Sequence, residues 1–189
     1  FKKARRTVSI NIAATLNDKT GDGAYYSSTQ FGSLSSLRDQ RYTLYNNSYN
    51  VAPNVTFTEP VGKKGQLMFT YNPSFQKSNA DKETYNKDTA TQTYTDLDPV
   101  FSNKYSNTYN TQKGGLSYRV GDRKLTFNAG LNMQYATLSG VQQYPLPYEL
   151  DKNFTSILPT AMLNMRNADG RNLRIMYRTN TNAPSITQL

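Results

Sequence analysis

The chain has 189 residues, of which 36% are hydrophobic, and its mean hydropathy of -0.74 is low for a domain with a large two-layer core. It contains no His and no Cys, which excludes imidazole-based activation of a nucleophile, disulfide frameworks and Cys-based zinc sites. The net charge of +9 comes from basic residues spread along the chain, so binding of nucleic acid is the weakest of the interpretations considered.

The composition favours strands over helices. The chain holds 20 Asn, 22 Thr and 15 Tyr, residues that suit strands with one face in water. No apolar run approaches the roughly 20 residues that a transmembrane helix requires, and no continuous apolar segment predicts a secretory signal. We therefore expect an all-β fold.

Alternation of apolar and polar residues predicts the strands in chain order. The first is the segment in which Val8, Ile10, Ile12 and Leu16 alternate with polar or small residues. Tight turns near residues 62, 122 and 168 divide the remaining chain into hairpins. The pattern predicts seven strands, at about residues 5-17, 38-59, 65-78, 104-120, 124-139, 154-166 and 171-181.

The connections alternate in length. The tight turns alternate with long polar segments, which are expected to be loops, at about residues 18-37, 79-103 and 140-153. Soluble domains rarely carry several long loops without structure, whereas bacterial transmembrane barrels have short turns at one end and long loops at the other. The pattern therefore predicts an antiparallel up-and-down meander that is part of a transmembrane β-barrel.

The two faces of these strands differ in chemistry. The polar face is predicted to line a lumen, with Asn128, Asn132, Gln134, Arg174 and Arg178 as its candidate residues. The other face carries no charge between the strand ends and is predicted to contact lipid, where a charge would cost about 2 to 4 kcal/mol. The candidate lipid-facing residues are Leu67, Phe69, Leu125, Phe127, Leu131, Leu173 and Ile175.

Some residues do not fit regular strands. Pro53, Pro73 and Pro159 each remove a hydrogen-bond donor from a predicted strand. Gly114 and Gly115 interrupt the alternation of the fourth strand and are interpreted as a β-bulge.

Three segments carry a resemblance to a known family: "VTFTEPVGKKGQLMFTYNPSF" (55-75), "YSNTYNTQKGGLSYRVGDRKLTFNAGLNMQYATLSG" (105-140) and "FTSILPTAMLNMRNADGRNLRIMYRTNTNAPSITQL" (154-189). With them the chain resembles the outer-membrane β-barrel family related to TonB-dependent receptors of Gram-negative bacteria. The most specific parts are Thr58-Glu59-Pro60 and the ending "TNAPSITQL".

The resemblance implies a location in the cell outer membrane, contact with its lipid bilayer and a role as a receptor or transporter. It also implies an extracellular ligand, which the sequence does not identify, and energy supplied by an inner-membrane complex through other parts of the protein. Single-chain bacterial barrels have an even number of strands, starting at 8, so we expect residues 1-189 to be one segment of a larger barrel domain.

Other chemistry has weaker support. Asp18 and Asp22 resemble part of a calcium loop, but Thr29 stands where a Glu is needed, so a Gly-rich loop tip is the preferred interpretation. Asp96 and Asp98 could bind a cation, although such residues more often start a turn. No cofactor, metal or catalytic function is expected.

Two further alternatives stay open. The tyrosines near strand ends fit an aromatic girdle or a ligand platform, and these are Tyr42, Tyr45, Tyr49, Tyr105, Tyr109 and Tyr135. The alternating strands also fit a soluble all-β surface module that binds glycans or mediates adhesion.

Overall fold

A computed structural model describes residues 4-167 and 171-181. The described chain forms one antiparallel sheet of nine strands. Their bounds are β1 (Thr7–Phe31), β2 (Leu34–Val61), β3 (Gly65–Tyr71), β4 (Ser74–Lys87), β5 (Tyr94–Leu97), β6 (Asn103–Gly121), β7 (Leu125–Tyr144), β8 (Tyr148–Arg166) and β9 (Asn172–Arg178). Among these residues, no helix is long and apolar enough to cross a membrane.

The nine strands form seven lines across the sheet. β3 and β4 pair successively with β2 on one side and with β6 on the other, so together they make one line. β5 pairs with β4 beyond the point where β6 ends, and therefore continues the line of β6. The predicted seven-strand meander corresponds to these lines, and the higher strand count comes from the two interruptions.

The interruption between β3 and β4 has a cause in the sequence. β2 pairs with β4 up to Val51 and with β3 from Val55, which places Pro53 opposite Pro73. Neither residue has an N–H group to donate, so the ladder opens where they face each other. Pro159 lies just beyond the last pair between β8 and β9, Thr160 with Arg178, and so interrupts no pairing with β9.

The predicted bulge at Gly114 and Gly115 is wrong. The register between β6 and β7 is continuous through both residues and shifts only near Lys104. A Cβ atom at position 115 would overlap the side-chain amide of Asn132 on the neighbouring strand. The glycine leaves room for that side chain and does not mark an extra residue.

The expected loops are also corrected. β1 and β2 stay paired from Thr7 with Thr58 to Phe31 with Leu34, so residues 18-37 form a long hairpin closed by Gly32 at a φ of 62°. β4 extends to Lys87, β5 lies within 79-103, and β7 and β8 occupy most of 140-153. These segments lose the apolar alternation, but strands that project into water need no apolar face, and their Thr and Tyr residues favour strands.

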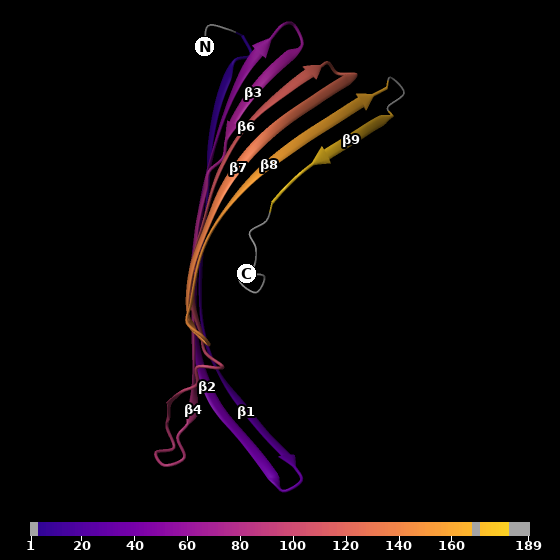
Figure 1. Cartoon of the computed structure of the whole chain (residues 1–189). Coiled ribbons are helices and arrows are strands. Elements are labelled where there is room, and N and C mark those ends of the chain that lie inside the picture. Colours follow the sequence, from indigo (N-terminus) through magenta and orange to yellow (C-terminus); the bar gives the residue numbers. More distant parts are fainter. Residues whose placement is uncertain (1–3, 168–170, 182–189) are drawn as a thin grey trace.

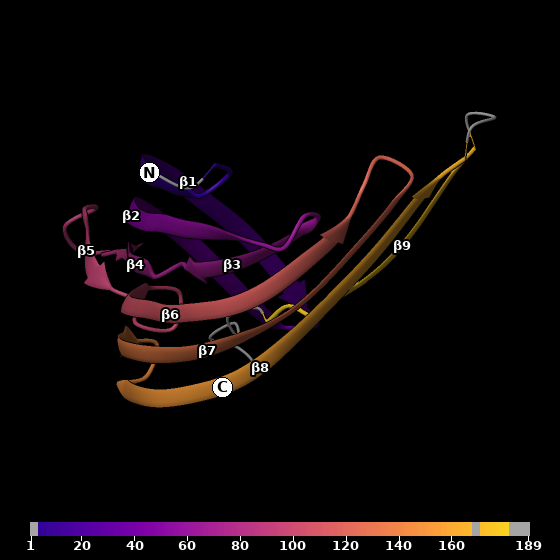
Figure 2. The same ribbon diagram turned by 90° about the horizontal axis from the view of Figure 1, so that it is seen from above.

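The sheet is a single curved layer (Figures 1 and 2). The tight turns at residues 62-64 and 122-124 lie together at one end, and the β1–β2 hairpin bends toward the concave side at the other end (Figure 1). The predicted turn near residue 168 lies outside the described residues. After β9 the chain passes along the concave side, where Gln134 Nε2 donates a hydrogen bond to Thr181 Oγ1 at 2.8 Å. The even-numbered residues of β7 therefore face the concave side. Within the described residues β1 pairs only with β2 and β9 only with β8, so the sheet does not close.

Burial is distributed opposite to that of a soluble sheet. Along β7 the apolar residues Leu125, Phe127, Leu131 and Met133 on the convex face are 42 to 60% exposed. The polar and small residues between them are less exposed. The buried apolar residues on this part of the sheet, such as Ala136 and Leu138, lie on the concave face instead. The most apolar surface of the described chain thus faces outward.

Candidate functional site on the concave face

The strand register brings the predicted lumen residues together on the concave face. Asn128, Asn132 and Gln134 alternate along β7, and Arg174 and Arg178 reach the same face through their pairs Asn164 and Thr160 on β8. One complete row of this face crosses six strands and consists of Ser9, Thr56, Thr70, Gly115, Asn132 and Leu158. The face is therefore polar from β1 to β9, with few apolar side chains.

The predicted lipid-facing residues all lie on the convex face. The row next to the one just described consists of Val8, Phe57, Phe69, Leu116, Leu131 and Pro159. Leu67, Leu125, Phe127, Leu173 and Ile175 occupy neighbouring rows of the same face. The structure groups the two sets of residues as predicted, while the contacts of each set with water or lipid stay predictions.

The height of this apolar band can be compared with a bilayer. Along β7 it runs from Leu125 to Tyr135, ten steps of about 3.4 Å each, or about 34 Å along the strand. With a strand tilt of roughly 40°, the band is about 26 Å tall, close to the apolar band of roughly 25 Å found on transmembrane barrels.

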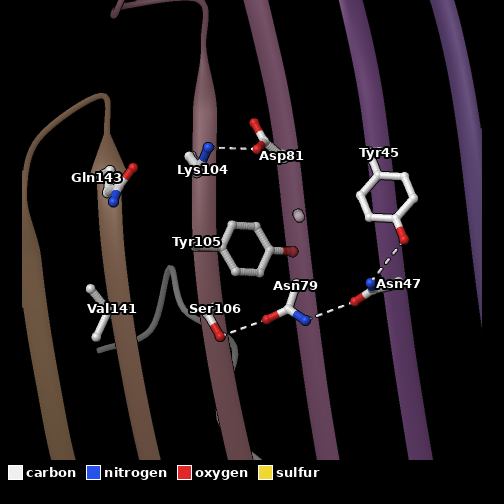
Figure 3. A pocket seen from close by; sticks show the side chains of 10 residues that line it. Tyr45, Asn47, Asn79, Asp81, Lys104, Tyr105, Ser106, Val141 and Gln143 are labelled. Carbon is white, nitrogen blue, oxygen red and sulfur yellow. Dashed lines mark hydrogen bonds and ion pairs between the residues drawn. The ribbon is translucent and has the colours of Figure 1, made fainter.

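The convex face becomes polar above the band. Asn79 of β4 connects the neighbouring strands β2 and β6. Its Nδ2 donates to Asn47 Oδ1 at 2.7 Å, and its Oδ1 accepts from Ser106 Oγ at 2.6 Å (Figure 3). Two residue pairs further along, on the same face, Lys104 Nζ lies 2.7 Å from Asp81 Oδ2. A polar ladder of this kind is suited to water or lipid headgroups and marks the upper limit of the apolar band.

The candidate tyrosines divide between the two faces. By register, Tyr45, Tyr49 and Tyr135 lie on the convex face, where a girdle would be, whereas Tyr42, Tyr105 and Tyr109 lie on the concave face. Sequence position near a strand end did not separate these two groups, because the separation depends on register.

A cationic hollow of about 560 Å³ lies at the short-turn end. Arg5, Lys64, Arg119, Arg123 and Arg166 line it together with a single carboxylate, Asp122. Lys64 is paired with Asp122 at 2.7 Å, and Arg5 donates to a backbone oxygen. The guanidinium groups of the other three form no hydrogen bond or ion pair within the described part of the chain, so the hollow attracts anions.

Asp122 organises the turn between β6 and β7 at this hollow. Its Oδ1 accepts hydrogen bonds from the backbone N–H groups of Lys124 and Leu125 at 2.9 and 3.2 Å. The ammonium of Lys64 and these two N–H groups lower the pKa of Asp122 to about 2. Sequence reasoning does not reveal the cluster, because Arg5, Lys64 and Arg123 lie in separate turns that only strand pairing brings together.

Buried amide oxygens on the concave face also lack hydrogen-bond donors within the described residues. Asn128 Oδ1 and Asn164 Oδ1 are buried, and no donor within residues 4-167 and 171-181 reaches them. Both lie on the concave face near the cationic hollow. Buried acceptors of this kind normally bind water or another polar group, so the concave face is built for contact with polar molecules.

The candidate cation residues do not form a loop site. Asp18 and Asp22 lie in β1, which also corrects the expected Gly-rich loop tip, because residues 17-26 belong to a strand. Asp98 Oδ2 accepts hydrogen bonds from Gln40 and Asn86, and its Oδ1 accepts from backbone N–H groups. Among the described residues, no three potential metal ligands of the His, Cys, Asp and Glu types lie together.

Comparison with known proteins agrees with this geometry. No curated protein sequence matches the chain. The profile of the outer membrane protein beta-barrel family, however, matches residues 1–189, the whole of the chain. The apolar outer band, the polar concave face and this match lead to one conclusion. The chain belongs to the outer membrane protein β-barrel family and is located in the outer membrane.

Proposed function

We propose that this sheet is part of the wall of a TonB-dependent-type receptor or transporter, with its concave face lining a path for solute uptake. The inverted distribution of burial is the observation that carries the proposal. Side chains that would form the core of a soluble protein lie on the convex surface, while polar and cationic side chains face inward. In a bilayer the first set contacts lipid and the second contacts water.

The edges of the sheet support closure into a larger barrel. Within the described residues, β1 and β9 each have one free edge, and a transmembrane strand cannot leave its backbone groups unpaired in lipid. Strands outside those described here would complete the wall. Energy coupling to an inner-membrane complex would likewise use other parts of the protein.

The alternative of a soluble surface module fits less well. A soluble sandwich covers the apolar face of one sheet with a second sheet. The described residues form a single layer, and Leu131, Met133 and Ile157 on its apolar face are 55 to 68% exposed. No catalytic role is proposed.

The receptor function can be tested by growth of the native Gram-negative host. A strain lacking the full-length protein is grown on a panel of defined single nutrient sources, beside a strain in which the inner-membrane energy-coupling complex is inactivated. We expect at least one nutrient that neither strain can use, and we expect the full-length gene to restore its use only in the first strain.

Other outcomes have distinct meanings. Growth that needs the protein but not the coupling complex would indicate a passive pore and contradict the TonB-dependent proposal. Unchanged growth of the deletion strain on every nutrient of the panel would contradict a role in nutrient uptake and favour a structural barrel.

A further inference from the structure

A second hollow, of about 270 Å³, lies on the concave side at the end away from the tight turns. β1, β2 and β4 form its walls, and Phe101, just before β6, closes one side. Tyr25, Arg38 and Tyr42 line it from the β1–β2 hairpin, which bends toward this side (Figure 1). If the sheet is the wall of a receptor, this rim pocket is at the mouth of the lumen on the long-hairpin side.

The floor of the rim pocket is buried and fixed by hydrogen bonds. Gln40 and Thr84, which line it, are each only 3% exposed, and Ser102 beneath is 2% exposed. Ser102 Oγ accepts a hydrogen bond from the backbone N–H of Thr84, and Thr84 Oγ1 donates to the Phe101 carbonyl at 2.8 Å. These bonds hold Phe101 against the sheet, so the pocket is preformed.

Two cations in the rim pocket have no anionic partner. The Arg38 guanidinium lies 4.2 Å from the centre of the Phe101 ring and 6.0 Å from that of Tyr25, and Lys82 Nζ lies 4.9 Å from that of Tyr42. Neither cation forms a hydrogen bond or ion pair with any residue that the structure describes. Asp98, the nearby carboxylate below the floor, is already bonded to Gln40, Asn86 and backbone N–H groups.

The hydrogen-bonding N–H groups of Arg38 and Lys82 are available to a ligand. The Arg38 guanidinium lies over the Phe101 ring, and its N–H groups have no partner among the described residues, so they stay free to bind a carboxylate through two parallel hydrogen bonds. The aromatic rings make most of the remaining lining apolar. The pocket is small, with room for about one ring.

We propose that the rim pocket binds a ring-bearing organic acid, with its carboxylate on Arg38 and Lys82 and its ring against Tyr25, Tyr42 and Phe101. The proposal deepens the receptor function, because it names the class of ligand that the mouth of the lumen would capture. Binding itself does not depend on uptake. A failed growth test with intact binding would remove the transport proposal alone, and the reverse result would remove only this one.

Binding is tested on the full-length protein, purified in detergent, by isothermal titration calorimetry. The probes are benzoate and glucuronate, two acids with different rings, compared with acetate, which lacks a ring, and glucose, which lacks a charge. We expect at least one of the two ring-bearing acids to bind about tenfold or more tightly than acetate and glucose. Equal binding of acetate, or no binding of either ring-bearing acid, would overturn the proposal.

Two variants test whether the ring-bearing acid binds in the rim pocket. Arg38→Gln and Lys82→Gln should each weaken binding of the ring-bearing acid by about tenfold or more, as expected for the loss of a charged hydrogen-bond partner. The matched control is Arg41→Gln, because Arg41 lies in the same strand and over another ring, Tyr94 at 4.6 Å, but on the convex face.

The control should leave affinity unchanged. An equal loss in Arg41→Gln would show a general electrostatic effect and contradict the assigned pocket. Heat-modifiable migration in gels confirms that each variant is folded before titration, and the Lys82 variant tests the site independently if the Arg38 variant does not fold.

Discussion

At the scale of single residues, Asp122 links turn geometry to pH dependence. Its carboxylate holds the β6–β7 turn through two backbone N–H groups and joins that turn to Lys64 of the β2–β3 turn. Because its pKa in the folded protein is about 2, below the usual 3.8, the ionised form is bound more strongly in the folded state. Its stabilising contribution is therefore present above about pH 4 and is lost as the pH falls through about 2.

We accordingly expect Asp122→Asn to lower the urea concentration at which the full-length barrel unfolds in detergent at pH 7. The difference from the wild type should shrink between pH 4 and pH 2 and vanish below that range, because the wild-type carboxylate is then protonated. Lys64→Met, which removes the largest cause of the low pKa, should shift this loss toward pH 4. A difference between wild type and Asp122→Asn that stays constant down to pH 2 would show that the carboxylate charge is not responsible.

At the scale of elements, sequence reasoning succeeded where apolar alternation is strong and failed where it fades. The strand predicted at residues 124-139 matches the start of β7 to one residue but ends five residues before Tyr144, and the two faces of β7 follow from its alternation alone. The local pattern predicts a loop at residues 18-37, where the structure has a hairpin, because Asp18, Gly21 and Gly23 interrupt the apolar alternation. Pairing with β2 stabilises this segment, and pairing is a long-range property that the local pattern does not contain.

The candidate sites show the same contrast between local alternation, which the sequence contains, and long-range pairing, which it does not. The faces of Asn132 and Leu131 could be assigned from period two, whereas the two hollows could not, because each collects residues from several strands or turns. The facing prolines, Pro53 and Pro73, show the limit clearly. The sequence predicts that each removes a hydrogen-bond donor from its strand, but only the register shows that the two form a single break.

The β1–β2 hairpin yields a prediction at this scale. Residues 21-44 project beyond the apolar band, so replacing them with Asn-Gly, which joins Thr20 to its partner Tyr45, should leave membrane assembly intact. Heat-modifiable migration of the full-length protein in outer-membrane fractions measures this assembly. The same variant lacks Tyr25, Arg38 and Tyr42 and should no longer bind the ring-bearing acid.

A shorter deletion within the band is the control. Removing the paired residues Ile10 with Val55 and Asn11 with Asn54 shortens two strands inside the apolar band by two residues each. This change should prevent assembly although it removes far fewer residues. Failure of the long deletion to assemble would instead show that the projecting hairpin is needed for folding.

At the scale of the whole molecule, the outward position of the apolar residues determines which solvent each face requires. A row of apolar residues crosses six strands on the convex face, and the next row, one residue further along each strand, is mainly polar on the concave face. Adjacent residues therefore meet different surroundings across the whole sheet. The net charge of +9 is compatible with this arrangement because cations such as Arg119 and Arg166 line the concave side, away from the apolar band.

Two neighbouring residues of β7 test this polarity directly in the full-length protein. Leu131→Arg places a charge near the middle of the apolar band. It should lower the free energy of unfolding by about 2 to 4 kcal/mol, because the guanidinium would face hydrocarbon. Asn132→Arg places the same charge one residue away on the concave face, where Gly115 leaves room for the side chain at position 132, and should change stability much less. Urea titration of the barrel refolded into lipid vesicles measures both values. Equal destabilisation would mean that the two faces meet similar surroundings, which would contradict the assignment of lipid to the convex face and water to the concave face.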